Sequence, residues 1–128
     1  DAAAALACPL HMPAGSDNLK RWFHSRVYDR AIGGSLAEKF RTARHLFETE
    51  DETPRAVAQW EGLGARAGTF VADVEGAATA KTIRDIDEAL TRRCFGFETV
   101  DDYYAHASSD QRVSSVQVPL LLLSAADD

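Results

Sequence analysis

The sequence is poor in the residues that build covalent cross-links. It has two cysteines among 128 residues, Cys8 and Cys94, and they stand far apart. This usage predicts neither a disulfide framework nor a zinc site, so we expect both to be buried, reduced thiols. The chain also lacks the apolar run of about 20 residues that spans a bilayer. We therefore predict no metal, no cofactor and no membrane-spanning helix.

Positive charge is also scarce. Fourteen Lys and Arg stand against 20 Asp and Glu, which gives a net charge of -6. Binding to nucleic-acid phosphates requires clustered cations in excess, so we predict no nucleic-acid partner. A hydrophobic content of 45% with 27% charged residues is typical of one folded globular domain of this length.

Two short apolar runs predict β-strands near the ends of the chain. Residues 120–123 are four leucines after Pro119, and residues 2–8 are a second apolar run. Runs this short and apolar favour strands buried on both faces of a parallel sheet. Asp127 and Asp128 follow the second run, where the carboxyl ends of parallel strands collect functional groups. The two carboxylates are equally consistent with a polar turn.

The residues between the two strands carry mostly helical patterns. Asp17 is expected to cap a helix that begins at Asn18, and Gly33 and Gly34 are expected to end it. Ser35 with Glu38 predicts a capping box for a second helix. The resulting helical region favours a lid over an active-site crevice, although a pair of crossover helices would give a similar pattern.

Three further helix starts are expected in this region. Pro54 suits the first position of a helix that runs to about Trp60. Thr82 and Thr99 are expected to cap two later helices, each with carboxylates in its first turn, where the helix dipole favours negative charge. Thr69 to Val74 is expected to form a short strand or a short helix.

Several spaced motifs occur in one order over residues 82–128. They are T-I-R-x-x-D-E-x-x-T, F-G-F, D-D-Y-Y-x-x-x-S and a V-P-L strand ending in S-A-x-D-D. This order resembles the late segment of the α/β-hydrolase superfamily, in its YheT-like and embryogenesis-associated branch of abhydrolase-domain esterases. Residues 5–12 and 27–47 show a weaker likeness, and residues 49–76 match poorly.

The resemblance implies an α/β fold class. The chain would be a fragment of an α/β-hydrolase fold in which two sheet strands flank a mostly helical lid insertion. Residues 1–10 would form one core strand, residues 11–112 the helical lid and crossover region, and residues 113–128 the core strand that ends at the catalytic acid. Because the chain opens and closes within sheet strands, we expect an internal fragment of a longer domain.

The implied activity is ester hydrolysis by a serine, an acid and a histidine in that chain order. Asp128 matches the acid position, with Asp127 as the alternative, and it would orient the catalytic histidine. No G-x-S-x-G occurs in these residues. We therefore expect the serine before Asp1 and the histidine after Asp128, and we predict that this chain alone is inactive. The histidines within the chain are expected to be surface or packing residues: His11, His24, His45 and His106.

The implied partner is a small-molecule or lipid ester. Aromatic residues of the helical region would line an acyl-chain pocket or simply pack the helices: Trp22, Phe23, Phe40, Phe47, Phe95, Phe97, Tyr103 and Tyr104. Apolar surface left exposed would allow peripheral membrane contact. A non-catalytic helical interaction module and a hydrolase-fold pseudoenzyme or acyltransferase are the alternatives.

Overall fold

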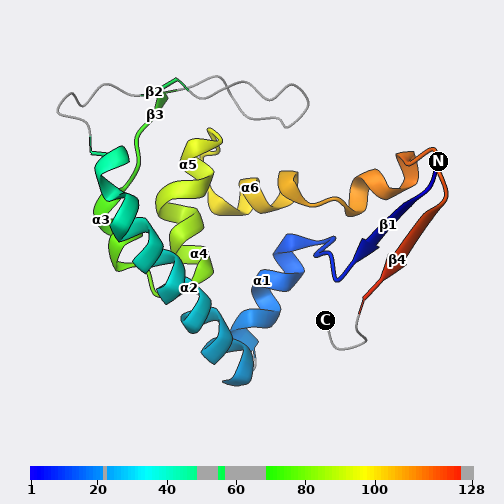
Figure 1. The fold of residues 1–128 in the computed structure, drawn as a ribbon, viewed down its shortest axis with the longest axis horizontal. Coiled ribbons are helices and arrows are strands. Elements are labelled where there is room, and N and C mark those ends of the chain that lie inside the picture. Colours follow the sequence, from blue (N-terminus) through cyan, green and yellow to red (C-terminus); the bar gives the residue numbers. More distant parts are fainter. Residues whose placement is uncertain (22, 49–54, 57–68, 125–128) are drawn as a thin grey trace.

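The computed structural model describes residues 1–21, 23–48, 55–56 and 69–124, and it describes 24–25, 55–56 and 69–70 by their backbone alone. This part of the chain is mostly helical (Figure 1). No helix in it is both long and apolar enough to cross a membrane. The elements follow in the order β1 (Ala3–Leu6), α1 (Met12–Arg21), α2 (Phe23–Ala43), η1 (Arg44–Leu46), β2 (Arg55–Ala56), β3 (Thr69–Phe70), α3 (Val74–Thr79), α4 (Ile83–Ile86), η2 (Asp87–Thr91), α5 (Arg92–Cys94), α6 (Val100–Ala107), η3 (Asp110–Ser115) and β4 (Leu120–Leu123).

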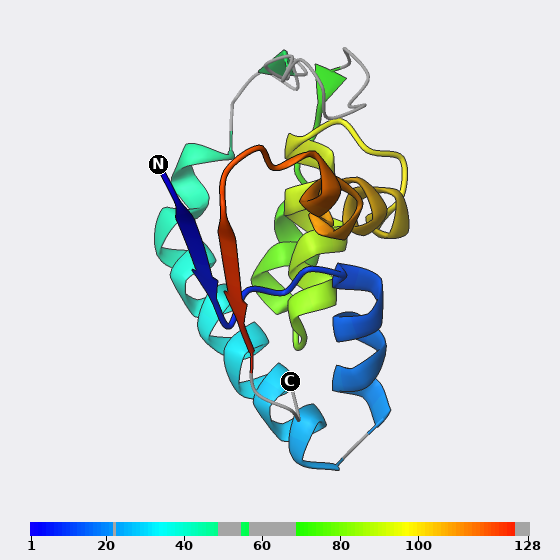
Figure 2. The same ribbon diagram turned by 90° about the vertical axis from the view of Figure 1, so that its right-hand side faces the viewer.

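The two apolar runs form a two-stranded parallel sheet. β1 lies beside β4, with Ala3 opposite Leu120 and Leu6 opposite Leu123 (Figure 2). The predicted parallel pairing is therefore confirmed. The expected burial on both faces is wrong for this chain, because Leu121 is 55% and Leu6 70% exposed. The other described elements do not pack over this two-stranded sheet, so both of its faces are exposed to solvent.

The first helix begins earlier than the sequence pattern predicts. α1 starts at Met12, and Nδ1 of His11 accepts a hydrogen bond from the Ala14 amide at 3.0 Å. His11 therefore satisfies a backbone donor that would otherwise lack a partner at this helix start. Asp17 lies inside α1, where it pairs with Lys20 at 3.3 Å. The predicted start at Asn18 with an Asp17 cap is wrong.

The two glycines do not break the second helix. α2 runs without interruption from Phe23 to Ala43. Gly33 is buried where α2 crosses the start of α4, and a Cβ built on it would lie 2.5 Å from Thr82 Cα. Glycine costs a helix interior about 1 kcal/mol relative to alanine, and the close crossing that it permits offsets this cost. The predicted end at Gly33 and Gly34 and the new start at Ser35 are wrong.

Small side chains fill most of the core that α2 shares with the later helices. Two clusters of buried residues lie there, and the larger partly buried side chains of Phe47, Val74, Leu90 and Leu36 pack against them. Small residues let helix backbones approach closely. The members of the two clusters are Phe40, Ala77, Ala78 and Ala89, and Ala37, Ala80 and Ile86.

A short antiparallel pair replaces the helix expected after Pro54. Arg55 pairs with Phe70 and Ala56 with Thr69, so the backbone at 55–56 is extended because it bonds to a strand 13 to 15 positions later. The helix prediction is wrong at these two residues, and its remainder lies outside the described residues. The strand alternative for Thr69 is confirmed at Thr69–Phe70, and helix α3 begins at Val74.

The two threonine caps are confirmed. Thr82 Oγ1 accepts from the Asp85 amide at 3.1 Å, and the Asp85 carboxylate accepts from the Thr82 amide at 3.0 Å. Burial opposes the charge of Asp85, but the hydrogen bonds from Lys81 and Thr82 still hold its pKa below the ordinary value. Thr99 Oγ1 accepts from the Asp102 amide at 3.0 Å. Both helices therefore begin at the predicted residues.

The two thiols differ from the expectation of burial. Both are free, as predicted. Cys8 is exposed, because it follows the open end of β1, so its expected burial is wrong. Cys94 is partly buried, and burial raises the pKa of its thiol. A thiol with a raised pKa is a poor nucleophile at neutral pH.

Candidate functional site

The carboxyl ends of the two parallel strands form one edge of the sheet. Leu6 lies opposite Leu123, and the Ala7 amide donates to the Leu123 carbonyl oxygen at 2.8 Å. Ala7 has a left-handed backbone with φ of 46°. A residue with a Cβ is strained in this region by about 1–2 kcal/mol, and such strain is frequent near functional sites. This edge is where the sequence predicts the reacting groups.

The two predicted site residues follow this edge directly. Asp127 and Asp128 stand four and five positions after Leu123 and lie outside the described residues. Their assignment as the triad acid therefore stays a prediction. The described residues nevertheless fix the strand that leads to them and its parallel neighbour.

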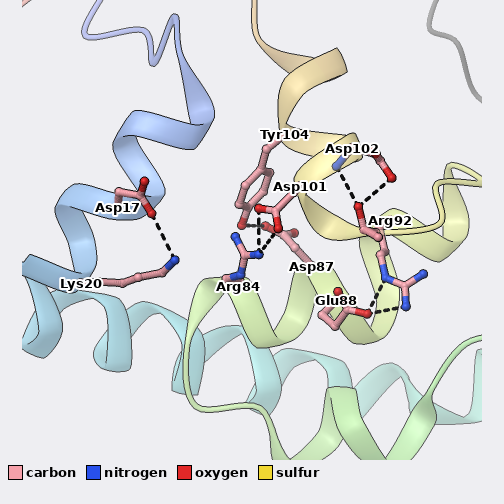
Figure 3. Close-up of polar contacts among 10 residues, drawn as sticks. Asp17, Lys20, Arg84, Asp87, Glu88, Arg92, Asp101, Asp102 and Tyr104 are labelled. Atoms are coloured by element: carbon pink, nitrogen blue, oxygen red, sulfur yellow. Dashed lines mark hydrogen bonds and ion pairs between the residues drawn. The ribbon is translucent and has the colours of Figure 1, made fainter.

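A bidentate ion pair joins the two motif-bearing helical segments. Arg84 of α4 donates through Nη2 to both carboxylate oxygens of Asp101 in α6, at 2.8 Å each (Figure 3). The hydrogen bond to Asp101 raises the pKa of Arg84. The Arg84 guanidinium carbon also lies 5.7 Å from the centre of the Tyr104 ring. This geometry fits a cation–π contact and links Arg84 twice to α6.

A second contact lies beside this ion pair and is more deeply buried. The Tyr104 hydroxyl donates to Asp87 Oδ2 at 2.7 Å, and Tyr104 is 4% exposed. Burial and the hydrogen bond to Asp87 both raise the pKa of this phenol. Arg84 with Asp101 and Asp87 with Tyr104 are each 17 positions apart. We call these two pairs the clasp, because they fasten α6 onto α4 and η2.

The helical segment that carries Arg84 and Asp87 continues into one π-helical turn, η2. It separates the short α-helical segments α4 and α5. Glu88 in this turn accepts a hydrogen bond from Arg92 Nε at 2.6 Å, and Arg92 Nη1 donates to the Phe97 carbonyl oxygen at 3.1 Å. Arg92 therefore holds the turn after α5, in which Gly96 has φ of 76°. Single π-helical turns of this kind are frequent at functional sites.

Ser108 connects the end of α6 to the start of α1. It is buried, and its Oγ accepts from the Met12 amide at 3.0 Å and donates to the Tyr104 carbonyl oxygen at 2.7 Å. The Leu10 carbonyl oxygen accepts from the Ser109 and Asp110 amides at 3.0 and 3.1 Å. These bonds tie the link between β1 and α1 to the helices that carry the clasp. Ser108 thus has a positioning role in the fold.

Comparison with known proteins gives relatives over most of the chain. It is 28% identical to the embryogenesis-associated protein EMB8 of Picea glauca over 98% of this chain and 24% of the relative. It is 38% identical to a monoacylglycerol lipase of Saccharomyces cerevisiae over 81% of this chain and 20% of that protein. It is 45% identical to the phospholipase ABHD3 of Bos taurus over 44% of this chain and 14% of that protein. No family model and no solved structure matches.

These relatives support the resemblance of this chain to a segment of the α/β-hydrolase superfamily. The chain spans about a seventh to a third of the length of the curated relatives, from 14% of ABHD3 to 32% of the esterase YheT of Escherichia coli. The resemblance inferred from the motifs is therefore confirmed at the level of the superfamily. The contacts within the clasp give those motifs a structural role in this α/β-hydrolase segment.

The sequence motifs did not reveal these contacts. T-I-R-x-x-D-E supplies Arg84 and Asp87, and D-D-Y-Y supplies Asp101 and Tyr104, so the two motifs pair with each other. The separation of 17 residues, which is the same in both pairs, is the one feature of the sequence that indicates these contacts. Helical spacing does not predict them, because it relates residues within one helix and does not identify the partner helix.

The described histidines have local roles, as expected. His106 Nδ1 lies 2.8 Å from the Asp102 carbonyl oxygen, and its ring packs on Phe97. His11 holds the start of α1, and His45 is exposed. The side chain of His24 lies outside the described set. Within the described ranges, we find no group of three His, Cys, Asp or Glu side chains that could hold a metal ion.

The aromatic residues divide into packing and exposed groups. Phe40 and Tyr104 are buried, whereas Phe95 stacks on Tyr103 with ring centres 5.9 Å apart. The packing role is thus confirmed for Phe40 and Tyr104. Phe23 is the exception, with 76% of its surface exposed. Trp22 lies outside the described residues.

Removing the Tyr104 hydroxyl should weaken the clasp. We expect Tyr104→Phe to lower the free energy of unfolding by about 1–2 kcal/mol, because Asp87 loses its donor in a partly buried place. Tyr103→Phe is the matched control, since no described group accepts a hydrogen bond from its hydroxyl. It should change stability by less than about 0.5 kcal/mol. Urea unfolding of both variants tests this, and equal losses would contradict it.

Proposed function

We propose that this chain supplies the lid and the triad acid of a serine ester hydrolase. Residues 1–10 and 113–128 would contribute core strands of the α/β-hydrolase sheet, and residues 11–112 the helical lid and crossover region. The observation that carries the proposal is the parallel pairing of β1 and β4, which directs both carboxyl ends to one edge. In open parallel sheets this edge is where substrates bind.

Asp128 would act as the triad acid, with Asp127 as the alternative. Its carboxylate would accept the Nδ1 proton of the catalytic histidine, fix the tautomer and stabilise the imidazolium that forms when the serine attacks. The serine and the histidine would come from polypeptide outside these 128 residues. The clasp would hold the lid helices in one arrangement above the sheet edge.

The substrate class would be carboxylic esters with short- to medium-chain acyl groups, or lipids. Two relatives support this class by their names, a phospholipase and a monoacylglycerol lipase. The half-buried side chains of Phe95, Phe97 and Tyr103 form one aromatic group on the helical region. This group would offer an apolar contact for an acyl chain.

A comparison of two polypeptides tests the proposal. The complete polypeptide that contains this segment should hydrolyse nitrophenyl esters and react with a serine-directed fluorophosphonate. The 128-residue chain alone should show neither reaction, because it lacks a nucleophile elbow. Turnover by the isolated chain would overturn the assignment of the missing groups. A complete polypeptide that neither turns over esters nor labels would favour the pseudoenzyme alternative.

A further inference from the structure

The first half of helix α2 is apolar on the side that faces away from the core. Asp29, Gly33, Ala37 and Phe40 recur at helical spacing and form the inner side, where Asp29 accepts from the Ile83 amide at 2.9 Å. The large apolar side chains of this half lie elsewhere on the helix surface. They are Phe23, Val27, Tyr28 and Ile32, which are 76%, 52%, 69% and 46% exposed.

The stretch of sequence that carries these apolar side chains is also rich in cations. Residues 17–32 contain four Lys and Arg and two Asp, a local charge of +2 in a chain of net charge -6. The two carboxylates are already engaged, Asp17 with Lys20 and Asp29 with the Ile83 amide. Within the described part of the chain, no carboxylate forms an ion pair with Arg21 or Arg30. Positive charge therefore remains available beside the apolar side chains.

The surface lies at a protruding end of the molecule. α1 ends and α2 begins at the point of the V that the two helices form, and both views place this point at the bottom (Figures 1 and 2). The core clusters lie farther along α2 and in α3, α4 and η2. A protruding end can approach a flat surface without moving the rest of the fold. We call the described residues of this end, 20–21 and 23–32, the tip.

We propose that the tip docks on a lipid bilayer that carries anionic headgroups. Apolar and aromatic side chains on one side of a helix, with flanking Arg and Lys, are the composition of helices that lie in the membrane interface. The cations match the negative surface of the bilayer, and Phe23 and Tyr28 would enter the boundary with the acyl chains. This contact goes beyond ester hydrolysis and needs no catalytic group.

Sedimentation with vesicles tests the proposal. The purified chain is mixed with vesicles of phosphatidylcholine alone or of phosphatidylcholine with phosphatidylserine, at low and at high salt. Binding should require phosphatidylserine and should weaken at high salt. We expect Phe23→Ser to weaken binding about tenfold or more. Arg30→Gln should weaken it roughly fivefold.

Two matched controls separate the tip from general stickiness. Leu6→Ser removes a side chain that is 70% exposed on the open sheet, close to the 76% of Phe23. Lys39→Gln removes an exposed cation of the same helix, seven positions beyond the tip. Both should bind as the unchanged chain does. Circular dichroism of each variant confirms that the helices are retained.

Four outcomes would overturn the proposal. They are the absence of binding, equal binding to vesicles without phosphatidylserine, equal losses in Leu6→Ser and Phe23→Ser, and a dimer in solution that Phe23→Ser abolishes. The last result would assign the tip to a second copy of this chain. None of these outcomes depends on ester turnover, so they are separate from a failure of the proposed hydrolysis.

Discussion

Replacing Asp128 by asparagine should lower ester turnover by the complete polypeptide about 10⁴-fold, with a much smaller change in KM. An amide in this position would leave the histidine in the wrong tautomer and would no longer stabilise the imidazolium. The measurement is kcat and KM with a nitrophenyl ester. Fluorophosphonate labelling of the serine should slow in parallel, because the same base activates the nucleophile.

Asp127→Asn is the matched control for this prediction. It changes a neighbouring carboxylate in the same way and should keep turnover within about tenfold of the unchanged enzyme, a loss of up to about 1.4 kcal/mol in the barrier. If the large loss appears in Asp127→Asn and not in Asp128→Asn, the acid is Asp127. If neither variant loses more than about tenfold, this strand does not supply the triad acid.

Placing a methyl group on Gly33 should destabilise the chain by about 1–3 kcal/mol. The added Cβ would meet the Thr82 backbone at 2.5 Å, and backbone atoms cannot rotate aside as a flexible side chain does. Helix α2 and the capping box of α4 would have to separate. The measurement is the free energy of unfolding of Gly33→Ala in urea.

Gly34→Ala is the neighbouring control, because a Cβ there meets nothing within 4 Å. Alanine is the better helix former, so this variant should gain about 0.5–1 kcal/mol. The two substitutions are chemically identical and adjacent on one helix, yet opposite signs are expected. If both variants were stabilised, the close crossing of α2 and α4 would be contradicted.

Local signals in the sequence predicted those parts of the fold that local interactions decide. The Thr82 and Thr99 caps need only a hydroxyl and a nearby amide, and both form as predicted. The short apolar runs predicted the strands and their parallel pairing. For the candidate site, the sequence predicted the strand edge, which the pairing of β1 and β4 confirms, whereas the role of Asp127 and Asp128 stays a prediction.

The wrong predictions concern interactions between distant segments. Gly33 looks like a helix end unless its contact with Thr82 is known, and that contact joins residues 49 positions apart. The early start of α1 depends on an unusual cap, a histidine ring at His11. The clasp requires two helices to meet at a given rotation, which helical periodicity does not specify. Contacts between distant segments therefore determine these helix boundaries and helix pairings, which local propensity does not predict.

The parallel pairing also sets the order in which the chain folds. Ala3 pairs with Leu120, which lies 117 positions later in the sequence. The helical contacts between α2 and α4 span shorter distances, so they can form before the strands meet. At a synthesis rate of about 5–20 residues per second, β1 waits roughly 6–23 s for β4 to leave the ribosome. We therefore expect the strands to join last, after the helices between them have brought the two ends together.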